Sequence, residues 1–389
     1  MKSNKVLLLF FFATLLSYSQ QNKIISVSND LNVDREFETI ELSKSVLGIK
    51  ITEVLEKYGI REMGTTQFLV SQCVDENGDG VSDVLLFQPT IKANSNKKFE
   101  VVLKRDAPAS PIQYCYSRFV PERTDDYAWE NNKVAFRTYG PTAQKMTEEK
   151  VKGGTLTSGI DAWLKRVDYP IINKWYEKYT NGTGTYHKDT GEGLDNFHVG
   201  GSRGIGGIAV KVGSVYYVSK NFTKWETITT GPIRTSFILT YADWDAAGNK
   251  ITETKKISLD YGNFLSKFEI SISGTPLIST GITLHDNDGK TQTNLKEGWI
   301  DYWQTLEDSE IGTGVVFPKF TGKHVEKYLN PDKDLCNLYV DLKVKKNKVT
   351  YYAGFGWKKQ GEYTSKESWE KYLGQFANKI NHPLRVKIN

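Results

Sequence analysis

NKITETKKISLDYGNFLSKFEISIS, residues 249–273, alternates apolar with polar side chains and is interrupted near its centre by Gly262 and Asn263. A period of two places successive side chains on opposite faces of an extended chain, so the segment predicts β-strands with one buried face. Overlapping its start, DWDAAGNKI at residues 243–251 has the Gly and Asn residues of a hairpin turn. This part of the chain therefore predicts antiparallel strands joined by short turns.

The same alternation, or a short β-branched run, recurs at residues 81–91, 98–106, 133–141, 206–222, 234–244 and 337–357. Helical patterns are few: residues 163–179, interrupted at Pro170, and residues 365–380, with Ser365 as an N-cap. No long Pro/Ser linker or internal repeat divides the chain. We predict an all-β fold: a large antiparallel β-sandwich (supersandwich, galactose-mutarotase-like) with a few short helices, as a single domain over residues 21–389.

The N-terminus has the features of a signal peptide over residues 1–20. MKSNK is basic, VLLLFFFATLL is apolar but too short to span a bilayer, and Ser17 and Ser19 supply the small residues for cleavage. No cysteine follows for a lipoprotein anchor, and no later run is long enough for a membrane helix. The sequence predicts a periplasmic or secreted protein without membrane insertion.

Composition narrows the class of partner. The formal net charge of +5 over 389 residues is too balanced to indicate a nucleic-acid partner. Three cysteines allow at most one disulfide, which excludes a disulfide-stapled scaffold. Nine Trp and 21 Tyr favour a sugar-binding protein, because aromatic faces cover the C–H face of a pyranose, although β-sheet cores also favour aromatic residues.

YHKDTGEGLDNFHVGGSRGIGG, residues 186–207, combines two histidines, an arginine and seven glycines. GGSRGIGG mimics a dinucleotide-binding loop, but that loop must open a helix, and the IAVKVGSVYYV that follows is strand-like. A metal site remains an alternative, without a recognised zinc spacing, on the ligand types His187, His198, Asp189, Glu192 and Asp195. The interpretation that fits better is an acidic-sugar site, in which His187 and His198 transfer protons and Arg203 binds a carboxylate.

Two further segments carry clustered polar residues. SRFVPERTDDYAWENNKVAFRTYGP, residues 117–141, interleaves charges with aromatic residues beside a strand, as a saccharide groove requires, whereas a surface charge cluster is the plainer interpretation. SQCVDENGDGVSDVLLFQ, residues 71–88, has the oxygen-rich spacing of a calcium loop, with Leu86 where an EF-hand has Glu. A structural Ca²⁺ would take Asp75, Asn77, Asp79 and Asp83 as ligands, and an ordinary turn between strands is the favoured alternative.

Four blocks of this sequence resemble the family catalogued as domain of unknown function 4861. They are RFVPERTDDYAWENNKVAFRTYGP, GIDAWLKRVDYPIINKWY, YHKDTGEGLDNFHVGGSRGIGG and YYAGFGWKKQGEYTSKESWEKYL, and VDENGDGVSDVLLFQ is similar to an early motif of the same family. The resemblance covers most of the chain and implies an exported protein found among enzymes that dismantle acidic polysaccharides. One branch is an ulvan oligosaccharide dehydratase, which removes water from a non-reducing-end glucuronic or iduronic acid and leaves a 4,5-unsaturated residue. No family-wide catalytic residue is carried over.

Such a dehydration is a β-elimination, which needs a base for the C5 proton, a cation beside the carboxylate and an acid for the leaving oxygen. We expect an acidic oligosaccharide as the partner and assign the catalytic roles to His187, His198, Tyr261 and Arg203. Substrate binding is assigned to Arg118, Arg123, Asp126, Trp129 and Trp163. The alternatives are a polysaccharide lyase, a non-catalytic glycan-binding protein, and a hydrolase with Asp125 or Asp126 paired with Glu192.

Overall fold

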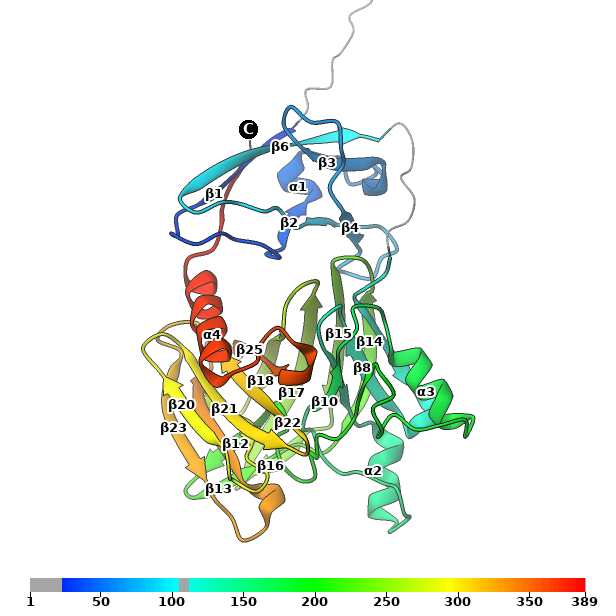
Figure 1. The fold of residues 1–389 in the computed structure, drawn as a ribbon, viewed down its shortest axis with the longest axis vertical. Coiled ribbons are helices and arrows are strands. Elements are labelled where there is room, and N and C mark those ends of the chain that lie inside the picture. Colours follow the sequence, from blue (N-terminus) through cyan, green and yellow to red (C-terminus); the bar gives the residue numbers. More distant parts are fainter. Residues whose placement is uncertain (1–22, 105–111, 389) are drawn as a thin grey trace, which may run out of the picture.

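The computed structural model describes residues 23–104 and 112–388, so the predicted signal peptide at residues 1–20 lies outside the described residues. A large β-sandwich forms most of the molecule, and a smaller lobe lies at one end of it (Figure 1). The strand pairs within the named sheets are antiparallel. The predicted all-β sandwich with a few helices is confirmed.

The largest sheet has nine strands and includes the segment from which the fold was predicted. In order across the sheet they are β14 (Phe222–Thr229), β15 (Arg234–Tyr241), β17 (Asn249–Asp260), β18 (Leu265–Ser273), β25 (Lys348–Trp357), β22 (Ser309–Val316), β21 (Trp299–Leu306) and β20 (Lys290–Asn294), and β16 (Trp244–Ala246) pairs with β17. Positive φ angles at Ala247 (54°) and Gly248 (87°) close the predicted β16–β17 hairpin.

Two five-stranded sheets complete the sandwich. One contains β13 (Val215–Tyr217), β12 (Ile205–Val212), β19 (Leu277–Thr283), β24 (Asn337–Lys343) and β23 (Gly322–Tyr328). The other, which we call the site sheet, contains β11 (Gly193–Leu194), β10 (Asp161–Lys165), β9 (Ala135–Thr138), β8 (Asp126–Glu130) and β7 (Tyr116–Val120). One continuous hydrophobic cluster draws on all three sheets, because each sheet has an apolar face that must be covered.

Helix α4 (Lys366–Asn381) covers one face of the nine-stranded sheet. Ser365 caps it, as predicted, by accepting from the backbone N–H of Ser368. Trp369 and Leu373 are buried against β22, where a Cβ on Gly312 would lie 2.5 Å from Trp369. Glycine on the strand therefore allows the indole to approach the backbone of the sheet.

The smaller lobe is built from both ends of the described chain. Its four-stranded sheet has the order β26 (Arg385–Ile388), β1 (Lys23–Asn29), β6 (Ser95–Leu103) and β3 (Tyr58–Glu62). A three-stranded sheet adds β2 (Ile40–Ser43), β5 (Val84–Phe87) and β4 (Ser71–Val74), and α1 (Lys44–Leu47) follows β2. The lobe has a hydrophobic cluster of its own, and β26 pairs with β1 through Val27 and Val386.

One predicted helix is shorter than its sequence pattern indicated. Within residues 163–179, the first residues belong to strand β10, and α3 spans only Ile172–Thr180. Pro170 lies between the two elements, consistent with the preference for extended backbone just before proline. Helix α2 (Pro141–Glu148) begins directly after the site sheet's β9.

Within residues 23–104 and 112–388, no helix has the length and apolar character needed to cross a membrane. The three cysteines, Cys73, Cys115 and Cys336, are all free.

Candidate functional site

Three of the sequence segments singled out above become neighbouring strands of the site sheet. Segment 117–141 supplies β8 and β9, GIDAWLKRVDYP supplies β10, and segment 186–207 supplies β11. The register places Arg137 of β9 directly opposite Asp161 of β10. Every residue of β8, β9 and β10 is buried, so these charged side chains are surrounded by protein. Buried charges need partners in the protein because water no longer solvates them.

Arg137 lies at the centre of three carboxylates. Its Nη2 is 2.6 Å from Asp161 Oδ2 and 2.9 Å from Asp195 Oδ2, and its Nη1 is 3.6 Å from Asp126 Oδ2. Nη1 also donates to the hydroxyl of Tyr186 at 3.3 Å. We call these residues the Arg137 cluster. One guanidinium does not balance three carboxylates, so the cluster favours retention of a proton on one of the acids.

The pKa values of two of these acids are raised, in both cases chiefly by burial. Burial, reinforced by the charge of Asp195, raises the pKa of Asp161 to about 8 although Arg137 opposes the shift. Burial also raises the pKa of Asp126 to about 6, against the opposing charges of Arg137 and Arg123. In the described part of the chain, Oδ1 of Asp161 and Oδ1 of Asp126 have no hydrogen-bond partner. At neutral pH Asp161 is therefore mostly a neutral carboxylic acid.

A cavity of about 600 Å³ opens beside the Arg137 cluster. Its walls include Arg137, Tyr139, Asp195 and both histidines of the glycine-rich segment, His187 and His198. We call it the histidine cavity. The structure brings the two predicted histidines together at one cavity, and the arginine that lines it with them is Arg137.

Each of the two histidines has one ring nitrogen in contact with an oxygen of the protein. Nδ1 of His187 lies 2.9 Å from the carbonyl oxygen of Asp195, which can only accept, so Nδ1 carries the proton and Nε2 is the basic nitrogen. Nε2 of His198 lies 3.0 Å from Asp334 Oδ1. The side chains of His187 and His198 are 52% and 69% exposed, so both imidazoles are accessible from solvent.

Tyr139 connects the cavity to the buried acids. Its hydroxyl donates to Asp161 Oδ2 at 3.2 Å, and its ring lies 5.2 Å from the guanidinium carbon of Arg137. Burial, followed by the charge of Asp161, raises the pKa of Tyr139 well above its ordinary value, so the hydroxyl is protonated at neutral pH. Tyr139 is thus a proton donor between a neutral acid and the cavity.

Two residues predicted to be catalytic lie away from this cavity. Arg203 is 1% exposed and donates to Ser158 Oγ, Thr157 Oγ1 and two backbone carbonyls, so it braces the glycine loop from behind. Tyr261 lies in the β17–β18 turn and lines another cavity, of about 330 Å³. The placement of Arg203 and Tyr261 does not fit direct action on a ligand beside His187.

The five residues predicted to bind substrate also lie outside the cavity lining. Arg118 is bound to Glu122 and Asn173, and Arg123 donates to the hydroxyl of Tyr186 on the outer side of the Arg137 cluster. Asp126 is a buried member of that cluster. The remaining two are core residues.

Trp129 is fully buried and donates through Nε1 to Ser266 Oγ at 2.9 Å. Trp163 is fully buried among Trp175, Tyr176 and Tyr186, with its ring 5.3 Å from the guanidinium carbon of Arg137. Neither indole presents a face to a ligand. Trp163 instead holds the Arg137 guanidinium in place.

The possible calcium loop is closed by its own hydrogen bonds. Asp75 accepts from the backbone N–H groups of Gly78 and Gly80, and Asp79 accepts from that of Val81. Within residues 23–104 and 112–388, no group of three or more His, Cys, Asp or Glu side chains is arranged to hold a metal ion. The contacts of Asp75, Asn77, Asp79 and Asp83 are those of the turn between β4 and β5, the alternative interpretation of this segment.

Sequence reasoning did not assign roles to Arg137, Tyr139 and Asp161. A signal for them was present: Arg137 and Tyr139 are two residues apart on a strand pattern, and Asp161 is a charged residue in an otherwise apolar segment, GIDAWL. A charge within a buried strand needs a buried partner, and these side chains partner each other.

Fold and site together define a large antiparallel β-sandwich protein with an ion-pair cluster buried beside a cavity lined by imidazoles. The chain belongs to the family described as domain of unknown function DUF4861, whose sequence profile matches residues 27–386. It is 55% identical over 391 residues to a protein of Formosa agariphila named uncharacterized protein P7, covering 98% of this chain and 99% of that protein. The family predicted from the sequence blocks is therefore confirmed.

Among solved structures, the chain is similar to a protein in glycosyl hydrolase family 38 from Enterococcus faecalis. That similarity has a TM-score of 0.50 at 10% identity and covers 96% of this chain and 48% of the other. An alpha-mannosidase from Enterococcus faecalis gives a TM-score of 0.44 at 9% identity, covering 95% of this chain and 46% of that one. The chain spans about half the length of these solved structures, and the first similarity concerns the fold.

Proposed function

We propose that this protein is a carbohydrate-active dehydratase of the periplasm or the extracellular space. It removes water across C4 and C5 of a uronic acid at the non-reducing end of ulvan oligosaccharides and leaves a 4,5-unsaturated residue. The observation that carries the proposal is that a basic imidazole nitrogen and an arginine line the same cavity of about 600 Å³. An elimination next to a carboxylate requires this pair of groups.

His187 is the proposed base. Its Nδ1 is held by the carbonyl of Asp195, so Nε2 is the nitrogen that accepts the C5 proton. His198 lines the same cavity and supplies a second imidazole. Glucuronic and iduronic acids present their C5 hydrogens on opposite faces, and two imidazoles in one cavity suit a substrate of either configuration.

Arg137 is the proposed partner of the substrate carboxylate. Its Nη2 is engaged by Asp161 and Asp195, whereas Nη1 has only the 3.3 Å hydrogen bond to Tyr186 and the longer approach to Asp126. Arg137 lines the cavity and is the cation that a substrate carboxylate would meet there. The enolate that forms after loss of the C5 proton carries a second negative charge, which a guanidinium stabilises.

Tyr139 and Asp161 are the proposed source of the proton for the leaving oxygen. Tyr139 donates its hydroxyl proton to O4 as the C4–O bond breaks, so that water leaves, and Asp161 returns a proton to the phenolate. Asp161 is then reprotonated from the imidazolium or from solvent, which balances the protons. The arriving substrate carboxylate adds a like charge near Asp161 and raises the pKa of that acid further, which keeps it protonated.

Ulvan oligosaccharides with a saturated uronic acid at the non-reducing end, incubated with the protein, test the proposal by mass spectrometry. The expected product is lighter than the substrate by one water and absorbs in the ultraviolet through its conjugated double bond. A shorter oligosaccharide would indicate a chain-cleaving lyase or hydrolase instead. An unchanged mass with measurable binding would indicate a glycan-binding protein.

A further inference from the structure

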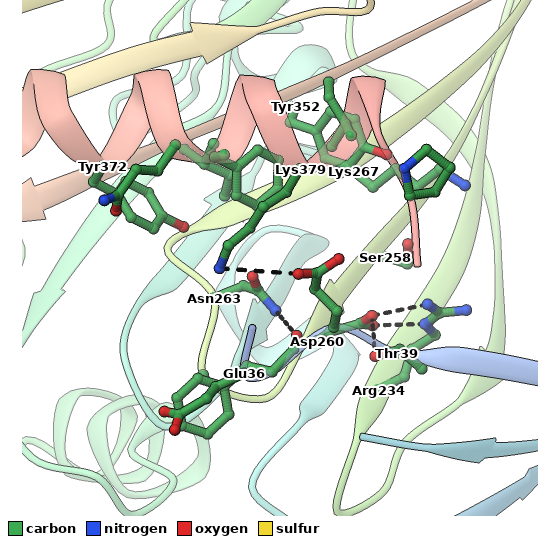
Figure 2. Close-up of a pocket in the computed structure, with 18 of the residues that line it drawn as sticks. Glu36, Thr39, Arg234, Ser258, Asp260, Asn263, Lys267, Tyr352, Tyr372 and Lys379 are labelled. Carbon is green, nitrogen blue, oxygen red and sulfur yellow. Dashed lines mark hydrogen bonds and ion pairs between the residues drawn. The ribbon is translucent and has the colours of Figure 1, made fainter. Parts of the chain in front are cut away.

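A second large cavity, of about 570 Å³, lies between the smaller lobe, the nine-stranded sheet and α4 (Figure 2). It shares no lining residue with the histidine cavity. We call it the interlobe cavity. Residues 34–41 of the lobe form one wall, the β17–β18 hairpin forms another, and Tyr372 and Lys379 face it from α4 (Figure 2).

The cavity is preformed because hydrogen bonds fix the lobe to the sheet around it. Thr39 Oγ1 donates to Asp260 Oδ2 at 2.6 Å, and Asn263 Nδ2 donates to the carbonyl of Phe37 at 3.0 Å. Arg234 binds Asp260 of β17 (Figure 2) and Glu41 of the lobe, at 2.6 Å to each. A ligand entering such a cavity does not have to order its walls, which favours binding.

Aromatic side chains line this cavity from both sides. Phe37 contributes from the lobe and is 40% exposed, with a φ of 58° that is unusual for an aromatic residue. Its ring rests on Gly262, where a Cβ would lie 2.3 Å from Phe37 Cγ. Tyr352, Tyr363 and Phe376 contribute from β25, the following loop and α4. Aromatic faces of this kind stack on the C–H face of a pyranose.

The charged side chains of the lining are nearly all in ion pairs, which disfavours an acidic ligand. Three of its six carboxylates are paired with cations outside the lining: Asp34 with Lys92, Glu38 with Arg35 and Glu362 with Lys133. The lining itself supplies three cations, Arg234, Lys267 and Lys379. Arg234 is already bound to two of the carboxylates, and Lys267 lies 3.1 Å from Glu269. Lys379 lies 3.9 Å from Glu38, so each of the three cations already has a carboxylate neighbour. A sugar that carries a carboxylate or a sulfate therefore finds no unpaired cation in this lining, and the matching ligand has no charge.

Several hydroxyls of the lining are available to such a ligand. Ser258, Tyr352 and Tyr363 have side-chain hydroxyls without a hydrogen bond to the described part of the protein. Burial raises the pKa of Tyr352 to about 12, so its hydroxyl remains a donor at neutral pH. Because such hydroxyls both donate and accept, they can form hydrogen bonds with the hydroxyl groups of a sugar.

We propose that the interlobe cavity is a second carbohydrate site, which binds an uncharged pyranose residue between Phe37 of the lobe and the tyrosines of β25 and the loop after it. The site has its own chemistry: aromatic stacking and neutral hydroxyls, where the histidine cavity has an arginine and imidazoles. It therefore holds a neutral sugar unit and leaves the acidic unit to the other cavity.

Saturation-transfer difference NMR with the methyl glycosides of glucose, xylose and rhamnose tests the proposal, with methyl glucuronide as the charged comparison. We expect transfer to the ring protons of at least one neutral glycoside. Phe37→Ala should weaken its binding about tenfold through loss of stacking. Tyr363→Phe, which keeps the ring and removes a hydroxyl without a partner in the described structure, should weaken it about three- to tenfold.

Two controls separate this site from the histidine cavity and from general surface effects. Phe320→Ala removes an aromatic side chain that is 85% exposed and outside the cavity, and should leave binding unchanged. His187→Gln should keep the neutral-glycoside signal even where it abolishes dehydration. The proposal is overturned if no neutral glycoside binds, if binding survives both Phe37→Ala and Tyr363→Phe, or if methyl glucuronide binds this site equally well.

Discussion

Replacement of Asp161 by asparagine tests the state of the Arg137 cluster. The asparagine side chain keeps the shape of the aspartate and resembles the protonated acid, but it does not titrate. The wild-type carboxyl has a pKa of about 8 when folded, against an ordinary value of 3.8. Between these values the folded protein holds a proton that the unfolded chain has released. The stabilising contribution of this proton is complete below the unfolded pKa and is lost as pH rises through the folded pKa.

The size of the effect follows from the proton count. One proton bound only by the folded state lowers the free energy of unfolding by about 1.4 kcal/mol per pH unit. When the pH rises from about 5.5 to about 7.5, the free energy of unfolding of the wild type should therefore fall by about 3 kcal/mol more than that of Asp161→Asn. Urea unfolding of both proteins at the two pH values, followed by circular dichroism, measures this difference.

Asp308→Asn is the matched control, because its side chain is 77% exposed and its pKa is lowered, first by the hydrogen bond from Lys359. The free energy of unfolding of Asp308→Asn should depend on pH in the same way as that of the wild type. If the free energy of unfolding of Asp161→Asn changes between the two pH values by the same amount as that of the wild type, Asp161 is ionised in the folded protein. The proposed proton source for the leaving oxygen is then wrong.

Three further substitutions test the supports of the site and the fold by calorimetry. Arg137→Met leaves the buried acids of the Arg137 cluster without their cation and should destabilise the protein by about 3–5 kcal/mol. Lys145→Ala, on an exposed pair, should change stability by less than about 0.5 kcal/mol. Arg203→Lys removes hydrogen bonds that brace the glycine loop and should reduce stability by about 2 kcal/mol, and an unchanged Tm would refute that bracing role. Ser365→Ala removes the N-cap of α4 and should reduce stability by about 1 kcal/mol, whereas a neutral result would mean that the cap contributes nothing.

Elements with one buried face were predictable from the sequence. Along β17 the burial of side chains alternates over most of the strand, which is the pattern that residues 249–260 display. In α4, Trp369 and Leu373 are buried on one face behind the Ser365 cap, as the helical spacing indicates. In both elements the local pattern of polar and apolar residues indicates which face packs against the core.

Fully buried and distant pairings were not predictable in this way. All five residues of β10 are buried, so the strand lacks alternation, and its segment was interpreted as the start of a helix. The pairing of β26 with β1 joins the two ends of the described chain, through Val27 and Val386. Local sequence does not identify a partner at that separation, so the smaller lobe was not recognised.

The sequence indicated only some of the residues that line the histidine cavity, for a similar reason. His187 and His198 were identified because imidazole chemistry and a glycine-rich segment are visible in sequence, and both line one cavity. The choice between Arg203 and Arg137 depends on what surrounds each guanidinium. Arg203 is enclosed by hydroxyl and carbonyl oxygens, whereas Arg137 lines the cavity among three acidic side chains. These surroundings come from distant parts of the sequence and are brought together only by the fold.

The initial rate of unsaturated product formation by wild type and His187→Gln, followed by ultraviolet absorbance on a uronic-acid oligosaccharide, tests the central claim most directly. General base catalysis by this imidazole predicts a loss of about 10²–10⁴-fold in the variant, with its circular dichroism unchanged. Full activity in a folded His187→Gln protein would contradict the account, because another group would then remove the C5 proton.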